Sequence, residues 1–283
     1  MATSEFVYGE PDRDTPDPGL FGPGSVSWRI HSDPSSGLAG VRALLLQALH
    51  PTAMAGLAAH SSYREEAWSR LFRTAQYIAV ITFGTTAEAE RAAAKVRGVH
   101  RRLGLDDPEL LMWVHFGFVD SLLSTYRRTA GLTPAEADAY VAEQVTAARL
   151  IGLDPATVPS TTAELDAYLA SVRPTLGITP EAREGARFIL LPPMRNDIRW
   201  LTPAVPAWAG LAATAFALQP RWARSMYGGG LGGVALGGIP GVTDWQATLA
   251  ARGWRTALMA LPESIRRGPH VAAAEQRLGL AAA

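Results

Sequence analysis

The sequence has no cysteine among its 283 residues. Disulfide bridges, thiolate metal sites and cysteine nucleophiles are therefore excluded. It also has no surplus of charge of either sign, because Lys+Arg and Asp+Glu both number 26. A protein whose main partner is nucleic acid needs a basic surplus for the phosphates, so the zero formal charge argues against that class.

Long apolar runs are also missing. A membrane-spanning helix needs about 18 or more apolar residues, and the nearest candidate, residues 203–218, is shorter and contains Pro206. The first 24 residues are acidic and rich in proline, without the basic start and apolar centre of a signal peptide. We therefore expect a cytoplasmic protein without a transmembrane segment. Its apolar surface leaves peripheral contact with lipid open, and its oligomeric state is not indicated.

Signals for β-strands are scarce, whereas signals for helix starts recur. A capping Thr or Asp directly precedes each of the prolines at positions 108, 134, 180 and 203. Thr161 is a further candidate cap, because Glu164 follows it at capping-box spacing. With 48% hydrophobic residues, wide apolar helix faces are expected. The prediction is one all-α domain of about ten helices over residues 25–283, after an extended arm at residues 1–24. Expected helices include residues 37–59 with a break or kink at Pro51, 63–81, 86–103, 108–129, 203–218, 245–260 and 263–280.

One glycine-rich segment, GGGLGGVALGGIPG at residues 228–241, matches G-x-G-x-x-G at Gly228, Gly230 and Gly233. The dinucleotide-binding motif requires a preceding strand and a βαβ unit. Here helix-like RWARSMY precedes the glycines and a proline follows them. The segment therefore predicts a loop between late helices.

The most informative polar pattern lies between residues 70 and 100. It predicts two helices joined by a tight turn at residues 83–85. In the first helix, Arg70, Arg73 and Thr74 share one face at i, i+3 and i+4 spacing. Tyr77 and Ile81 continue that face. In the second helix, His100 lies beside an apolar stripe formed by Ala92, Val96, Val99 and Leu103. This arrangement indicates a metal-centred cofactor between the two helices.

Each of these side chains also has a structural explanation. His100 is either an iron ligand or a core histidine that hydrogen-bonds to the backbone. Arg70 and Arg73 either donate to bound dioxygen or a propionate, or form salt bridges with nearby carboxylates. The carboxylates considered are those of Glu65, Glu66 and Asp120.

Three further residues are candidates for contact with a cofactor. His50 and His115 lie in strongly apolar segments, where a histidine is a second ligand, a distal residue or a packed core residue. Arg29, near His31, holds a propionate or forms a surface ion pair. Hydrolase motifs of the G-x-S-x-G and H-E-x-x-H types are absent from the sequence.

Four segments in order resemble the MpaB-type oxygenase family, whose superfamily includes the latex-clearing rubber oxygenases. They are SWRIHSDP, LLLQALHPTAMAGLAAHSSY, RLFRTAQYIAVITFGT and KVRGVHRRLGLDDPELLMWVH, within residues 25–265. The resemblance implies an all-helical, globin-like core that holds haem b. The family pattern Lys-Val-Arg-x-x-His falls on residues 95–100 and gives His100 the role of proximal iron ligand. The distal arginine and threonine match Arg70 and Thr74, whereas Arg73 stands where the rubber oxygenases have lysine.

The resemblance implies a haem-dependent oxygenase that acts on an apolar substrate, saturated or unsaturated, with O2 bound opposite His100. Arg70, Arg73 and Thr74 would stabilise the charge that develops on dioxygen. The apolar pocket is expected from the 37–59 and 108–129 helices. Double-bond cleavage, hydroxylation and peroxidase-like turnover all stay open. The alternative is a non-catalytic helical protein that binds or senses haem or lipid with the same pocket.

Overall fold

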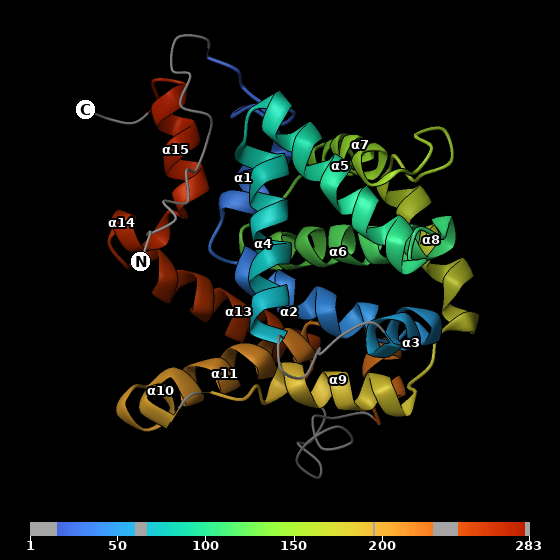
Figure 1. Ribbon diagram of the computed structural model, residues 1–283. Coiled ribbons are helices and arrows are strands. Elements are labelled where there is room, and N and C mark those ends of the chain that lie inside the picture. The colour runs from blue at the N-terminus through green and yellow to red at the C-terminus, as the bar shows by residue number, and fades with distance from the viewer. Residues whose placement is uncertain (1–15, 60–66, 195, 229–242, 281–283) are drawn as a thin grey trace, which may run out of the picture.

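The computed structural model of the protein describes residues 16–59, 67–194, 196–228 and 243–280. Over these ranges the regular elements are helices and no strand occurs, which confirms the prediction of a single all-α domain. The helices labelled in Figure 1 enclose a common core. In chain order they are α1 (Val26–Ser32), α2 (Ser36–Gln47), α3 (Pro51–Ala59), α4 (Ala67–Phe83), α5 (Thr86–Leu103), α6 (Pro108–Thr129), α7 (Pro134–Ile151), α8 (Thr162–Val172), a 3₁₀ turn (Arg173–Thr175), α9 (Pro180–Leu190), α10 (Asn196–Leu201), α11 (Ala204–Ala217), α12 (Arg221–Met226), α13 (Asp244–Met259), α14 (Glu263–Arg266) and α15 (Pro269–Arg277).

The core is built around α6, the longest of these helices, with α2 lying along it (Figure 1). Trp113 of α6 is fully buried, and its indole nitrogen donates to the backbone oxygen of Gln47 at 3.1 Å. One apolar cluster joins α2 and α6 to α9, α11 and α13. A second joins α6 to α1, α7 and α8. The central helix therefore has apolar contacts on most of its sides.

A buried arginine, Arg42 on α2, lies within this core and contacts α6. It is 2% exposed, and its guanidinium lies 2.8 Å from the carboxylate of Asp120 on α6. It also donates to the backbone oxygen of Leu218 at 3.0 Å and to the hydroxyl of Ser121 at 2.6 Å. Asp120 was considered above as a partner for the arginines of the 63–81 helix, and it pairs with Arg42 instead.

The two helices of the predicted pair meet at the expected turn. Helix α5 has the predicted bounds, and Thr85 and Glu88 form a capping box at its start. Gly84 in the turn is buried, and a Cβ atom there would lie 2.5 Å from the backbone oxygen of Val80. Only glycine therefore fits this close approach of the chain to itself.

Residues 16–24 contain no helix up to the N-cap region of α1, and they are anchored to this same turn. The carboxylate of Asp17 accepts hydrogen bonds from the backbone nitrogens of Gly19 and Thr86, each at 2.7 Å. Arg277 in α15 donates to the backbone oxygens of Asp17 at 3.0 Å and Phe83 at 2.9 Å. We call these contacts among Asp17, Thr86, Phe83 and Arg277 the turn clamp.

The structure differs from the expected elements near both ends of the chain, and it confirms the break at Pro51. Residues 26–32 form helix α1, which is not among the expected helices, with Ser25 as the N-cap. At Pro51 the chain divides into α2 and α3, as predicted. The segment expected as one helix over 263–280 divides into α14 and α15, because Pro269 begins a new helix. Most of the glycine-rich segment lies outside the described residues.

None of the helices in the described ranges combines the length and apolar character needed to cross a membrane.

Candidate functional site

Helices α4 and α5 contact each other, and they pack on α1 and α7. In Figure 1 they join at the turn and diverge toward their far ends. The start of α4 and the end of α5 therefore lie at the open side of this pair. The candidate residues of α4 and His100 of α5 belong to these two ends.

His100 lies in the last turn of α5 and is half-buried. Its Nδ1 atom is shielded from solvent and has no hydrogen-bond partner in the structure. Burial lowers the pKa of the imidazole, and the charge of Asp106 partly opposes this shift. Buried polar atoms are nearly always satisfied in folded proteins, so this ring nitrogen is free to accept a ligand.

The buried face of α5 differs slightly from the predicted stripe. Ala89 and Ala93 are the fully buried positions, and the four predicted stripe residues are half-buried. Positions 89, 93, 97 and 100 recur at helical spacing. His100 therefore continues the buried face of α5, one turn beyond Arg97.

Tyr77 on α4 provides a second unpartnered polar atom. Its hydroxyl is buried without a hydrogen-bond partner, and burial raises its pKa to about 12. The ring packs against an apolar cluster of α4, α5 and α7 that includes Ile81 and Ala93. The helix pair thus carries two polar atoms, one on each helix, that no described protein group satisfies.

Residues 70, 73 and 74 all lie in the first half of α4, as predicted. The side chain of Arg70 falls outside the described part of the structure. Arg73 and Thr74 are exposed. Phe72, which precedes Arg73 in the sequence, is also exposed, at 69%. The roles assigned to Arg70, Arg73 and Thr74 stay predictions.

The other candidates have protein partners. The Nε2 atom of His115 lies 3.1 Å from the backbone oxygen of Gln144, and burial lowers the His115 pKa to about 4. The Nδ1 atom of His50 accepts from the backbone nitrogen of Ala53 at 3.3 Å, which caps α3. Arg29 forms an exposed ion pair of 2.7 Å with Glu136. These contacts match the structural explanations given above for these residues.

A buried polar network was not anticipated from the sequence. The Nδ1 atom of His31 lies 2.8 Å from the hydroxyl of Thr82, and Nε2 lies 3.1 Å from the hydroxyl of Tyr140. Burial lowers the pKa of His31 to about 3, so the ring is neutral near pH 7. The network links α1, α4 and α7 behind the candidate site, and its members are too distant in sequence for a local motif to reveal them.

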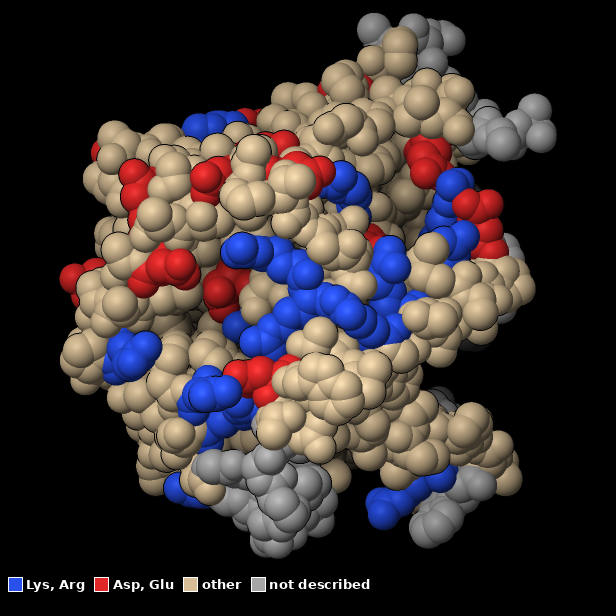
Figure 2. Space-filling view, turned by 180° about the vertical axis from the view of Figure 1, so that it is seen from behind, with Lys and Arg blue, Asp and Glu red and all other residues tan. Residues whose placement is uncertain are grey.

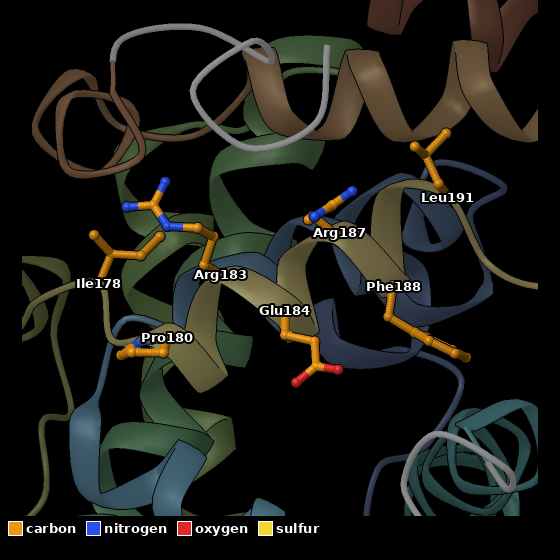
Figure 3. A pocket seen from close by; sticks show the side chains of 7 residues that line it. All are labelled: Ile178, Pro180, Arg183, Glu184, Arg187, Phe188 and Leu191. Carbon is orange, nitrogen blue, oxygen red and sulfur yellow. The ribbon is translucent and has the colours of Figure 1, made fainter. Parts of the chain in front are cut away.

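A cavity of about 760 Å³ lies beside α9. In Figure 3, Arg183 and Arg187 point to one side of this helix and Glu184 points to the other. None of the candidate residues is among the described residues that line it. The lining residues are Ile178, Pro180, Arg183, Glu184, Arg187, Phe188 and Leu191.

The donor set limits the kinds of metal site. In the described ranges, no three His, Asp or Glu residues cluster in a way that could hold a metal ion. A haem iron is held mainly by the porphyrin and needs as little as one imidazole from the protein. The unpartnered ring nitrogen of His100 fits that requirement.

Comparison with known proteins assigns the family. Residues 28–234 match the family described as ER-bound oxygenase mpaB/B'/Rubber oxygenase, catalytic domain. No curated protein and no solved structure gives a significant match. The matched segment covers most of the chain and runs from α1 through α12, so it includes the whole α4–α5 pair. The chain therefore belongs to the family of the MpaB and rubber oxygenase catalytic domains.

Proposed function

We propose that this protein is a haem b-dependent oxygenase that uses O2 to oxidise a small apolar substrate, with His100 as the residue that would hold the iron. The family supports oxygenase chemistry. The observation that carries the cofactor assignment is the buried Nδ1 atom of His100, which has no partner. The histidine also ends the pattern Lys-Val-Arg-x-x-His that the rubber oxygenases share.

When bound, haem supplies an iron centre at which dioxygen is activated. The protein supplies a neutral imidazole for it. Burial lowers the pKa of His100, so near pH 7 a ring nitrogen keeps the lone pair that a metal ligand needs. Tyr77 adds a hydroxyl that can donate to a polar group of the cofactor or of a ligand beside it.

The first half of α4 supplies cations and a hydroxyl. Arg70, Arg73 and Thr74 can turn donors toward dioxygen as negative charge develops on it. Arg73 keeps the positive charge of the lysine found in the rubber oxygenases, but its planar guanidinium has different reach and donor geometry. We infer that this position tunes the reaction of this protein relative to those enzymes.

The first experiment measures haem retention. We expect His100→Ala to lose haem and His115→Ala to keep it, since His115 already hydrogen-bonds to Gln144. The pyridine haemochrome assay gives haem per chain, and circular dichroism shows whether each variant folds. Imidazole added together with free haem should restore haem binding to the His100→Ala variant. Full haem in that variant without imidazole would reject His100 as the ligand.

The second experiment measures turnover. The holoenzyme should consume O2 in the presence of an apolar alkene and a reductant. Arg70→Ala should keep its haem and consume O2 at least about ten-fold more slowly, in line with the loss of one charge-stabilising donor. Haem retention without O2 consumption by the wild-type protein would instead favour a role in binding or sensing.

A further inference from the structure

The outer face of α13 carries large apolar side chains in solvent. Trp245 is 70% exposed and Leu249 is 56% exposed, whereas Ala247 and Ala251 on the inner face are buried. Arg252 follows at the same helical spacing, so positions 245, 249 and 252 share one face at i, i+4 and i+7. The solvent-exposed face of α13 therefore carries large apolar side chains, where a surface helix normally has polar ones.

Unpaired positive charge lies at one end of this face. Arg252 donates from Nε to the backbone oxygen of Arg128 at 2.9 Å, which brings the two arginines together at the end of α6. The Nη1 atom of Arg128 is buried without a partner. Burial and the nearby charges of Arg42 and Arg224 lower the pKa of Arg128, so an added anion would stabilise its charged form.

The acidic groups around Arg128 already have partners. Asp120 pairs with Arg42 at 2.8 Å. Asp244 pairs with Arg224 at 2.7 Å and with Arg221 at 2.9 Å, and the side chain of Arg221 is 81% exposed. Asp244 directly precedes Trp245, so its partner Arg221 places positive charge at the Trp245 end of the face, opposite Arg252. Basic side chains gather in a band on the face of the molecule shown in Figure 2.

We propose that this surface, formed by Trp245, Leu249, Arg252, Arg128 and Arg221, docks on an anionic lipid bilayer. Tryptophan and leucine on one helix face can enter the interface between headgroups and acyl chains. Arginines at both ends of the face complement the negative surface of the membrane. The same geometry fits an apolar protein partner less well, because the unpartnered Nη1 atom of Arg128 would need a carboxylate from that partner.

The proposal is independent of haem, but it suits the proposed function, since apolar substrates partition into bilayers. A helix lying in the membrane surface would hold the enzyme where such a substrate is concentrated.

Vesicle flotation of the full-length protein tests this surface. We expect the wild type to float with vesicles of phosphatidylcholine mixed with phosphatidylserine, and much less with phosphatidylcholine alone. The R128Q/R252Q double variant should bind the mixed vesicles about twenty-fold more weakly, given the usual contribution of each arginine near an anionic surface. The W245A/L249A double variant should bind both kinds of vesicle more weakly, because its apolar anchors are gone.

Matched controls remove similar groups elsewhere. R101Q/R149Q takes two exposed arginines from α5 and α7, and L280A removes an apolar side chain that is 53% exposed. Both controls should float like the wild type. Circular dichroism and haem content show that each variant is folded.

Three results would overturn the proposal. The wild type could fail to float with mixed vesicles, or the R128Q/R252Q and W245A/L249A variants could float as well as the controls. The third is self-association without lipid binding, seen in analytical ultracentrifugation as a dimer that W245A/L249A dissolves. That result would assign the face to a second copy of this chain.

Discussion

At the scale of single residues, the protein contains two kinds of buried polar group. Tyr227 and His115 hydrogen-bond to backbone oxygens and therefore belong to the fold. Tyr77 and His100 each have a buried atom without a partner. A buried donor or acceptor without a partner costs about 1–3 kcal/mol, so the second kind lowers stability unless a ligand satisfies it. This difference makes Tyr77 and His100 candidates for contact with a ligand.

The Tyr77 hydroxyl gives a direct test of that difference. In haem-free protein, Tyr77→Phe should leave the free energy of unfolding unchanged or raise it by up to about 1 kcal/mol, because the lost hydroxyl has no partner. Tyr227→Phe should lower it by about 1–2 kcal/mol, because its hydroxyl donates to Leu45 at 2.6 Å. Urea denaturation measures both, and equal losses in the two variants would mean that Tyr77 is satisfied within the fold.

The ion pair between Arg42 and Asp120 gives a second residue-scale prediction. Asp120→Ala leaves a guanidinium that is 2% exposed without its carboxylate, so we expect a loss of about 3–5 kcal/mol. Arg149→Gln is the control, because its pair with Glu90 is exposed and should contribute less than about 1 kcal/mol. Chemical denaturation compares the two, and a small loss in Asp120→Ala would show that water reaches Arg42.

At the scale of elements, the helices with local start signals could be predicted, and the others could not. Helices α5, α6, α7 and α8 begin at a capping side chain that reaches only three residues along the chain. Helix α1 also has a local cap, Ser25, but its first turn is completed by Glu143 of α7, whose carboxylate accepts from the backbone nitrogens of Val26 and Ser27. Those groups are 116 to 117 positions apart, so no local pattern could show them.

The same reasoning applies to the candidate site. His100 could be proposed from the sequence because the six-residue pattern that ends in it lies within two turns of one helix. The Arg42 cluster could not, because the partner Ser121 is 79 positions away and only the packing of α2 on α6 brings them together. The exposure of Trp245 could not be predicted from the sequence either, since an apolar residue in a helix is normally expected in the core.

The cap of α5 gives the element-scale prediction. Thr85→Ala removes the hydroxyl that accepts from the backbone nitrogen of Glu88, so the free energy of unfolding should fall by about 1 kcal/mol. Thr85→Ser keeps an equivalent oxygen and should stay within a few tenths of the wild type. Thermal denaturation of the three proteins measures this. If Ser and Ala destabilise equally, packing of the Thr85 methyl group is responsible and the cap is not.

At the scale of the whole molecule, buried histidines couple the fold to pH. The pKa is lowered from 6.5 to about 3 in His31 and to about 4 in His115. In the unfolded chain both rings gain protons below pH 6.5, whereas in the folded protein they stay neutral. The contribution of these two histidines to the free energy of unfolding is therefore fully present above about pH 6.5. It is lost as the pH falls from there toward the folded pKa values.

The expected loss between pH 7 and pH 5 is about 2 kcal/mol for each of these two histidines. Urea denaturation at both pH values measures it. In His115→Gln the pH-dependent loss should shrink by about 2 kcal/mol, whatever the absolute stability of the variant. An unchanged pH dependence in His115→Gln would show that this ring is protonated in the folded state.

The turn clamp has a consequence for the order of events during synthesis. Arg277 is 260 positions from Asp17 and 194 from Phe83, yet it bonds to both. The clamp can close only after residue 277 has left the ribosome, although α4 and α5 emerge much earlier. The α4–α5 hairpin therefore leaves the ribosome well before Arg277, the residue that secures its turn.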